Sequence, residues 1–153
     1  MPETINGATP EFLEPKPVEK AFNRVLGFLV GLGIGPKYIY LLQVRGRKSG
    51  RIYATPVNVL EVGEKRYLIA PRGRTQWVRN AEAAGEITLK RGSNIANFRL
   101  RAIPDGQKAE LLKLYLERYA AAVQKYFTVK AGSGVEAFQQ VEAKYPVFEL
   151  VAK

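Results

Sequence analysis

The stretch that decides the fold is YIYLLQVRGRKSGRIYATPVNVLE, residues 38–61. An apolar run at 38–45 is followed by a short segment with glycine at both ends and then by a second apolar run at 53–61. The second run alternates in part, which places Val57 and Val59 on one face. Two such runs separated by a glycine-bounded turn predict two neighbouring strands.

The turn between these strands, Gly46-Arg-Lys-Ser-Gly50, lies within a dense group of cations that also includes Arg45 and Arg51. Glycine allows a tight turn and close approach to a ligand, while arginine, lysine and serine all donate hydrogen bonds to phosphate oxygens. The spacing is not that of a P-loop, because no Lys-Ser/Thr pair follows the second glycine. The turn indicates an anion site, and a solvated hairpin tip is the equally consistent alternative.

The composition bounds the class of protein. At 153 residues the chain has the length of one domain, and its 46% apolar and 25% charged content is that of a globular protein. It contains no cysteine and no histidine, which excludes thiolate catalysis, a Ser-His-Asp triad and Cys- or His-based metal sites. An enzyme of this composition needs a bound cofactor to carry its reaction. No secretion signal is predicted, and we expect a cytoplasmic protein.

The positive charge is concentrated in the middle of the chain. The formal net charge is +10, and residues 43–101 hold 13 Lys and Arg against four acidic residues. A field of this kind favours a polyanion, such as nucleic acid, acidic lipid or a phosphorylated cofactor.

The rest of the chain predicts one α+β domain over residues 18–153, preceded by a proline-rich irregular arm at 1–17. Apolar spacing predicts a helix at 18–34, packed on the core or lying on a membrane surface. Further strands are expected at 66–71, 86–90, 95–103 and 146–152, and further helices at 75–84, 107–127 and 135–143. With few crossover helices, the strands favour a mostly antiparallel, barrel-like sheet with peripheral helices.

Two further motifs could contribute to a site. In Ala70-Pro-Arg-Gly-Arg-Thr-Gln-Trp77, Thr75 can cap a helix whose N-terminus attracts anions. Trp77 either stacks on a flat ring or anchors the core. Pro56 lies inside a strand, which predicts an edge or a bulge with backbone N–H groups available nearby.

Taken in order, these motifs resemble the deazaflavin-dependent nitroreductase and quinone reductase family of actinobacterial, mycobacterial-type proteins. The resemblance extends over about residues 22–150 and rests on GRKSG at 46–50, TPV at 55–57, APRG at 70–73, WVRNAEAAG at 77–85 and the ending YPVFEL. It implies a six-stranded split β-barrel related to FMN-binding barrels. It also implies transfer of a hydride from reduced coenzyme F-420 to a quinone, an enone or a nitroaromatic.

The resemblance implies which residues bind the cofactor, which has a deazaisoalloxazine ring, a ribityl phosphate and an oligoglutamate tail. Those expected at the phosphate and tail are Arg47, Lys48, Ser49 and Gly50. Those expected beside the ring are Tyr53, Ala54, Thr55, Pro56 and Val57, with Ala70, Pro71 and Arg72 beneath it. Those expected to close the pocket are Gln76, Trp77 and Asn80. No metal is implied.

The chain also departs from the family pattern. The segment between Ala70 and Trp77 looks shorter than in the nitroimidazole-activating members, and their tyrosine-rich substrate segment has no clear counterpart in residues 120–145. We therefore carry over no catalytic residue. The resemblance admits a homodimer and peripheral attachment to the inner face of a membrane.

Three alternatives stay open at this point. FMN could replace the deazaflavin, because the fold admits both. The protein could bind a cofactor or another anionic ligand without catalysis. It could also bind nucleic acid, although aromatic residues do not interleave with the basic strand 98–101.

Overall fold

The computed structural model describes residues 24–30, 32–33 and 35–153. The predicted arm at 1–17 and the first part of the predicted helix at 18–34 lie outside the described residues. Residues 24–30 are helical.

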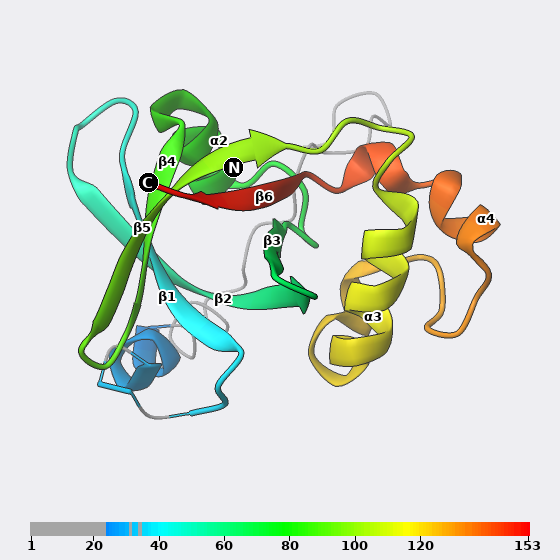
Figure 1. The fold of residues 1–153 in the computed structure, drawn as a ribbon, viewed down its shortest axis with the longest axis horizontal. Helices are drawn as coiled ribbons and strands as arrows, with labels where there is room; N and C mark the ends of the chain where they lie inside the picture. The colour runs from blue at the N-terminus through cyan, green and yellow to red at the C-terminus, as the bar shows by residue number, and fades with distance from the viewer. Residues whose placement is uncertain (1–23, 31, 34) are drawn as a thin grey trace, which may run out of the picture.

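Six antiparallel strands close into a barrel in the order β1-β2-β3-β6-β5-β4 (Figure 1). Their bounds are β1 (Ile39–Arg45), β2 (Ile52–Val62), β3 (Lys65–Ile69), β4 (Glu86–Arg91), β5 (Asn94–Ala102) and β6 (Val147–Ala152). The predicted fold class is confirmed, and the strand ends differ from the prediction by one or two residues.

Strand alternation divides apolar side chains between two cores. Within β3, Leu68 joins the cluster that also contains Leu42 and Phe98, whereas Tyr67 and Ile69 join the cluster under the helices. Because successive side chains of a strand point to opposite faces, one short strand supplies both cores.

The helices lie around the barrel. They are α2 (Gln76–Ala84), α3 (Ala109–Val123), η1 (Gln124–Tyr126), α4 (Val135–Gln139) and η2 (Glu142–Lys144). Figure 1 shows α3 and α4 together on one side of the barrel. The predicted stripe of α3 is confirmed, because Leu112, Tyr115, Leu116, Tyr119 and Val123 are all buried.

Two predicted helices are shorter than expected. The helix expected at 107–127 ends at Val123 and continues as the 3-10 turn η1, after Tyr119 departs from helical geometry at φ −121° and ψ 28°. The helix expected at 135–143 ends at Gln139, and a separate 3-10 turn follows at η2. Periodicity alone did not reveal these breaks, because the apolar spacing continues across them.

Two hydrogen bonds fix the end of α3 beside β2. The Tyr119 hydroxyl donates to the backbone oxygen of Val59 at 2.7 Å, and Arg118 Nη1 donates to that of Glu61 at 2.7 Å. Both acceptors lie in the second half of β2. The last turn of α3 is therefore held close to this strand.

Among the described residues, the first half of β2 pairs with one strand. It pairs with β1 from Ile52 to Asn58, but among the described residues it pairs with β3 only from Val59 to Val62. Pro56 lies in the half without β3, which confirms the predicted edge, although the barrel as a whole is closed.

A buried carboxylate fixes the start of α3. Glu142 is only 8% exposed, and its Oε1 accepts hydrogen bonds from the backbone N–H groups of Gly106 at 2.9 Å and Lys108 at 3.1 Å. These donors precede α3, and Lys108 is its N-cap residue. The carboxylate therefore satisfies backbone donors that the helix itself cannot.

We expect Glu142→Ala to lower the free energy of unfolding by about 1–3 kcal/mol, because it leaves these buried donors unsatisfied. Urea unfolding followed by circular dichroism measures the change. Glu64→Ala is the matched control, since Glu64 is exposed. Equal stability of the two variants would contradict this role of Glu142.

Candidate functional site

A pocket of about 1190 Å³ lies along the open edge of β2. Its walls come from the 46–49 turn, the first half of β2, the segment leading into α2, and the end of α3 with η1. Thirteen of the predicted site residues line it: Arg47, Lys48, Ser49, Tyr53, Ala54, Thr55, Pro56, Val57, Pro71, Arg72, Gln76, Trp77 and Asn80.

Two predicted site residues do not line the pocket. Gly50 lies in the turn at φ 76°, where its N–H donates to the Gly46 oxygen at 3.0 Å. Ala70 is 2% exposed and packs in a core cluster with Val78 and Phe148. Both residues support the backbone beside the pocket.

Close packing holds the 46–50 turn. Gly46 N–H donates to the Arg51 oxygen at 2.7 Å, and the oxygen of the Ser49 hydroxyl accepts from the Arg51 N–H at 3.2 Å. A Cβ at Gly46 would lie 2.5 Å from Cε2 of Tyr53. A side chain at position 46 would therefore displace the Tyr53 ring, whereas Gly50 has the positive φ that favours glycine.

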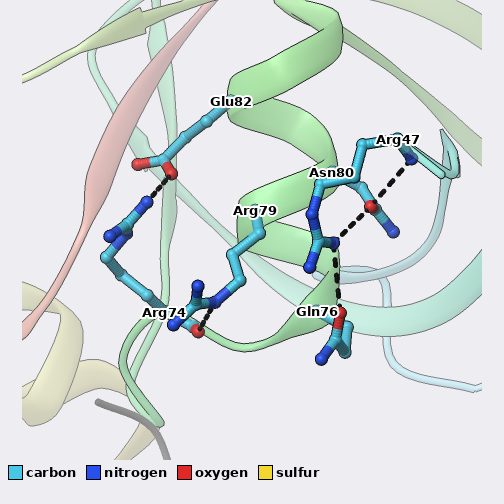
Figure 2. A network of polar contacts seen from close by, with 6 residues as sticks. All are labelled: Arg47, Arg74, Gln76, Arg79, Asn80 and Glu82. Atoms are coloured by element: carbon cyan, nitrogen blue, oxygen red, sulfur yellow. Dashed lines mark hydrogen bonds and ion pairs between the residues drawn. The ribbon is translucent and has the colours of Figure 1, made fainter.

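Helix α2 positions Arg47 (Figure 2). Arg47 Nη1 donates to Asn80 Oδ1 at 2.7 Å and to Gln76 Oε1 at 3.1 Å, and the Arg47 backbone N–H donates to the same Asn80 oxygen at 3.1 Å. Asn80 is 6% exposed. A buried amide on the helix therefore fixes both the backbone and the guanidinium of the loop arginine.

The other cations near α2 divide into two groups. Arg74 forms an ion pair with Glu82 at 2.7 Å, and Arg79 Nε donates to the Arg74 oxygen at 3.1 Å; Figure 2 shows both contacts to the left of the Arg47 contacts. Neither arginine lines the pocket. Lys48 does line it, and it pairs with no carboxylate in the part of the chain that the structure describes.

The start of α2 presents polar groups to the pocket. Thr75 is the N-cap residue, as predicted, but its side chain makes no capping hydrogen bond. Its hydroxyl oxygen is buried and has no hydrogen-bond partner among the described residues, although the residue lines the pocket. A buried hydroxyl without a partner is costly, and a polar ligand group would satisfy it.

Trp77 combines the two roles that the sequence left open. It lines the pocket, and it also packs against two clusters of the core. The ring is half-buried, so one part of it anchors α2 while another part stays accessible to a ligand.

Sequence reasoning missed the wall that comes from the end of α3. This wall consists of Tyr115, Ala121, Ala122, Val123, Lys125 and Tyr126, and further lining comes from Leu26, Ile39, Val44, Gly46, Asn58, Ile69 and Thr75. Helical spacing correctly placed Tyr115 in the core, but spacing does not reveal that the end of α3 returns to β2. The feature of the sequence that could have indicated this wall is the presence of tyrosines between residues 120 and 145.

Cationic side chains line the pocket. Its lining includes Arg47, Lys48, Arg72 and Lys125 and, among the described residues, no aspartate or glutamate. Burial raises the pKa of Tyr115, although a hydrogen bond with Asn58 opposes the shift, so this tyrosine stays neutral. The site can bind a large, flat, anionic molecule, and no side chain of its described lining is a hydride donor.

Comparison with known proteins identifies the family. Residues 18–131 match the sequence model described as F-420H(2)-dependent quinone reductase. No curated protein matches the chain at a significant level.

Similar solved structures show the same fold. One, described as a domain-swapped dimer, is 20% identical with a TM-score of 0.52, over 87% of this chain and 96% of that one. A reductase dependent on reduced F-420 is 21% identical with a TM-score of 0.50, over 74% and 94%. A protein of unknown function from Agrobacterium tumefaciens is 18% identical with a TM-score of 0.56, over 94% and 59%.

The family match favours a deazaflavin over FMN and an enzyme over a passive binder. The chain belongs to the F-420H(2)-dependent quinone reductase family, and it is an oxidoreductase that uses reduced coenzyme F-420 to reduce a small-molecule acceptor.

Proposed function

We propose that the pocket beside β2 binds coenzyme F-420 with the phosphate and acidic tail at the 46–49 turn and the ring beside residues 53–57. The acceptor is an electron-poor small molecule such as a quinone, an enone or a nitroaromatic. The observation that carries the proposal is the continuity of one pocket from the cationic turn to the open edge of β2 and Trp77.

The residues present fit this cofactor. Arg47, Lys48 and Arg72 match a polyanion in charge, and the Thr75 hydroxyl is a buried polar group that lacks a partner among the described residues. Val57 and Trp77 supply apolar surface for a flat ring. Reduced F-420 supplies the hydride when bound, since no side chain of the described lining is a hydride donor.

The protein contributes binding, orientation and exclusion of water. Both side-chain hydrogen bonds of Arg47 to α2 use Nη1, so the opposite edge of the guanidinium can face a phosphate. Lys48 adds a charge that is not paired with a carboxylate in the part of the chain that the structure describes. Trp77 and the end of α3 also line the pocket, and the reacting atoms must be held close together there.

Turnover tests the proposed function. We expect the protein to oxidise reduced F-420 with a quinone as acceptor, and we expect Lys48→Ala to raise the KM for the cofactor about tenfold because it removes a charge-assisted contact. Stopped-flow absorbance of the cofactor measures the rate. Lys130→Ala is the control, since Lys130 is exposed and does not line the pocket.

Binding of the cofactor without turnover of any quinone, enone or nitroaromatic would contradict the reductase assignment. Turnover with an unchanged KM in Lys48→Ala would instead contradict the placement of the phosphate.

A double-mutant cycle tests whether Asn80 acts through Arg47. We expect Asn80→Ala and Arg47→Ala each to weaken F-420 binding about tenfold, and the double variant to lose no more than either single one. Isothermal titration calorimetry gives the dissociation constants, thermal unfolding checks that each variant is folded, and Gln140→Ala is an exposed control. Fully additive losses would contradict the positioning role of Asn80.

We propose a cytoplasmic protein that associates peripherally with the inner face of a membrane. Among the described residues no helix could cross a membrane, since none is long and apolar enough. Supporting the proposal, Val25, Phe28 and Leu32 are 59%, 68% and 59% exposed, and Leu26 of the same segment lines the pocket. A quinone dissolved in the membrane would have a short path to the site.

Co-sedimentation with anionic lipid vesicles tests this association. We expect Phe28→Ser to lower the bound fraction several-fold, at a cost of about 1 kcal/mol or more of apolar transfer energy. Ile52→Ser removes an equally exposed apolar side chain elsewhere and should have no effect. Failure of the unaltered protein to bind the vesicles would contradict the proposal.

We also propose a homodimer, supported by the family resemblance and by the neighbour described as a domain-swapped dimer. Light scattering should give twice the monomer mass, and the monomer mass at micromolar concentration would contradict it.

A further inference from the structure

The helical segment 24–30 forms part of the pocket wall. Its Leu26 lines the pocket, as does Pro56 of β2. A Cβ at Gly27 would lie 3.9 Å from Cδ of Pro56 and 3.3 Å from a leucine of β1, so the helix backbone packs directly on these two strands. The proposed placement of the cofactor has the ring beside residues 53–57. In that placement the helix borders the ring end of the pocket.

One side of this helix packs on the barrel. Val30 is fully buried, whereas Val25 and Phe28 are exposed. An element that buries few apolar side chains opens locally at a small cost in free energy. The helix therefore depends on contacts made by neighbouring segments to stay at the pocket.

Arg91, the last residue of β4, supplies such contacts. Its Nη1 donates to the Ile39 oxygen at 3.0 Å, and its Nη2 donates to the Gly35 oxygen and, at 3.5 Å, to the Gly33 oxygen. Among the described residues, the pairing of β1 with β4 begins only at Leu41. The Arg91 side chain thus holds the backbone that connects the helix to β1, where strand pairing does not reach.

The backbone brings the same two segments into contact. A Cβ at Gly33 would lie 3.3 Å from Cα of Gly92, in the turn between β4 and β5. The Gly33 N–H donates to the Val30 oxygen at 2.8 Å, which joins this contact to the end of the helix. Figure 1 shows the helix beside this turn. The Arg91 guanidinium therefore lies by the end of a helix where a cation is favoured.

We propose that Arg91 is a positioning residue for the reaction, because it holds helix 24–30 at the barrel and so keeps Leu26 in the wall beside the cofactor ring. Arg91 does not itself line the pocket, so it acts through the helix. Loss of its guanidinium lets the helix leave the pocket more often, which exposes the ring to solvent. The inference rests on the proposed function.

Thiol labelling without cofactor tests the hold on the helix. The chain has no cysteine, so Val30→Cys places a single thiol on the buried side of the helix. We expect N-ethylmaleimide to modify this thiol about tenfold faster when Arg91→Gln is added, because local opening becomes more frequent. Arg91→Lys retains the charge and one donor group and should give a smaller increase. Intact-mass spectrometry measures the rates.

Two controls separate this opening from general damage. Arg99→Gln makes the same substitution at an exposed arginine of β5 and should leave the labelling of Val30→Cys unchanged. Val147→Cys places the thiol in β6 at a position that is 1% exposed, and its labelling should stay equally slow with and without Arg91→Gln. If Arg91→Gln does not fold, Arg91→Lys takes its place in every comparison.

Solvent access to the bound ring tests the link to the pocket. Oxidised F-420 is fluorescent, and quenching by acrylamide, a neutral molecule, reports how exposed it is. At saturating F-420 we expect Arg91→Gln and Leu26→Ala each to raise the quenching constant about twofold. The double variant should raise it no further, because both substitutions act on the same wall. Arg99→Gln should match the unaltered protein.

Unchanged labelling of Val30→Cys in the Arg91 variant would overturn the hold on the helix. A parallel rise at Val147→Cys would overturn it too, since Arg91 would then support the whole barrel. Faster labelling with unchanged quenching would overturn the link to the pocket. Absence of F-420 binding by the unaltered protein would be a separate result: it would overturn the proposed function, while the labelling would still decide whether Arg91 holds the helix.

Discussion

The site depends on a difference in length between two neighbouring strands, β2 and β3. β2 has 11 residues and β3 has five, and the two pair only over the last four residues of β2. The barrel still closes, because β3 also pairs with β6, and the first half of β2 pairs with β1. A strand edge that lacks a neighbour needs other partners for its backbone polar groups. The pocket lies along this edge, so the closed fold and the binding site share one origin.

Two helices complete the site in different ways. α2 brings a buried amide to the cationic turn and fixes its arginine, so a charged loop becomes an ordered one. α3 is held to the second half of β2 by Tyr119, and its end supplies an aromatic and apolar wall. The cations of the 46–49 turn come from the loop beside α2, and much of the apolar wall comes from the end of α3, which η1 extends with Lys125. This division suits a cofactor that has a polyanionic end and a flat reactive ring.

Much of this arrangement could be predicted from the sequence. Strand alternation and glycine-bounded turns indicated a six-stranded antiparallel sheet, and Pro56 indicated an edge. The cationic turn and Trp77, which local motifs singled out, line one pocket. The α3 wall was not predicted, since which helix end reaches β2 depends on long-range packing. The hydrogen bond between Arg47 and Asn80 was not predicted either. The two residues are 33 positions apart, and no local sequence pattern links them. Ala70 was misplaced for the same reason: its burial against Phe148 depends on the closing strand.

The absence of histidine and cysteine acquires a physical meaning in this site. In the proposed placement the side chains bind and orient the cofactor, while the electron chemistry belongs to the bound molecule. Arg47, Lys48 and Arg72 of the basic middle segment line the pocket, so in the proposed placement part of that positive charge retains the bound molecule.

The most direct measurement is a titration of Trp77 fluorescence, the only tryptophan signal of the chain, with oxidised F-420 and with FMN in parallel, repeated on Lys48→Ala. The account predicts saturable quenching by F-420, weaker in Lys48→Ala, and little or no quenching by FMN. Quenching by FMN alone, or none by either, would contradict the claim that this pocket holds the deazaflavin.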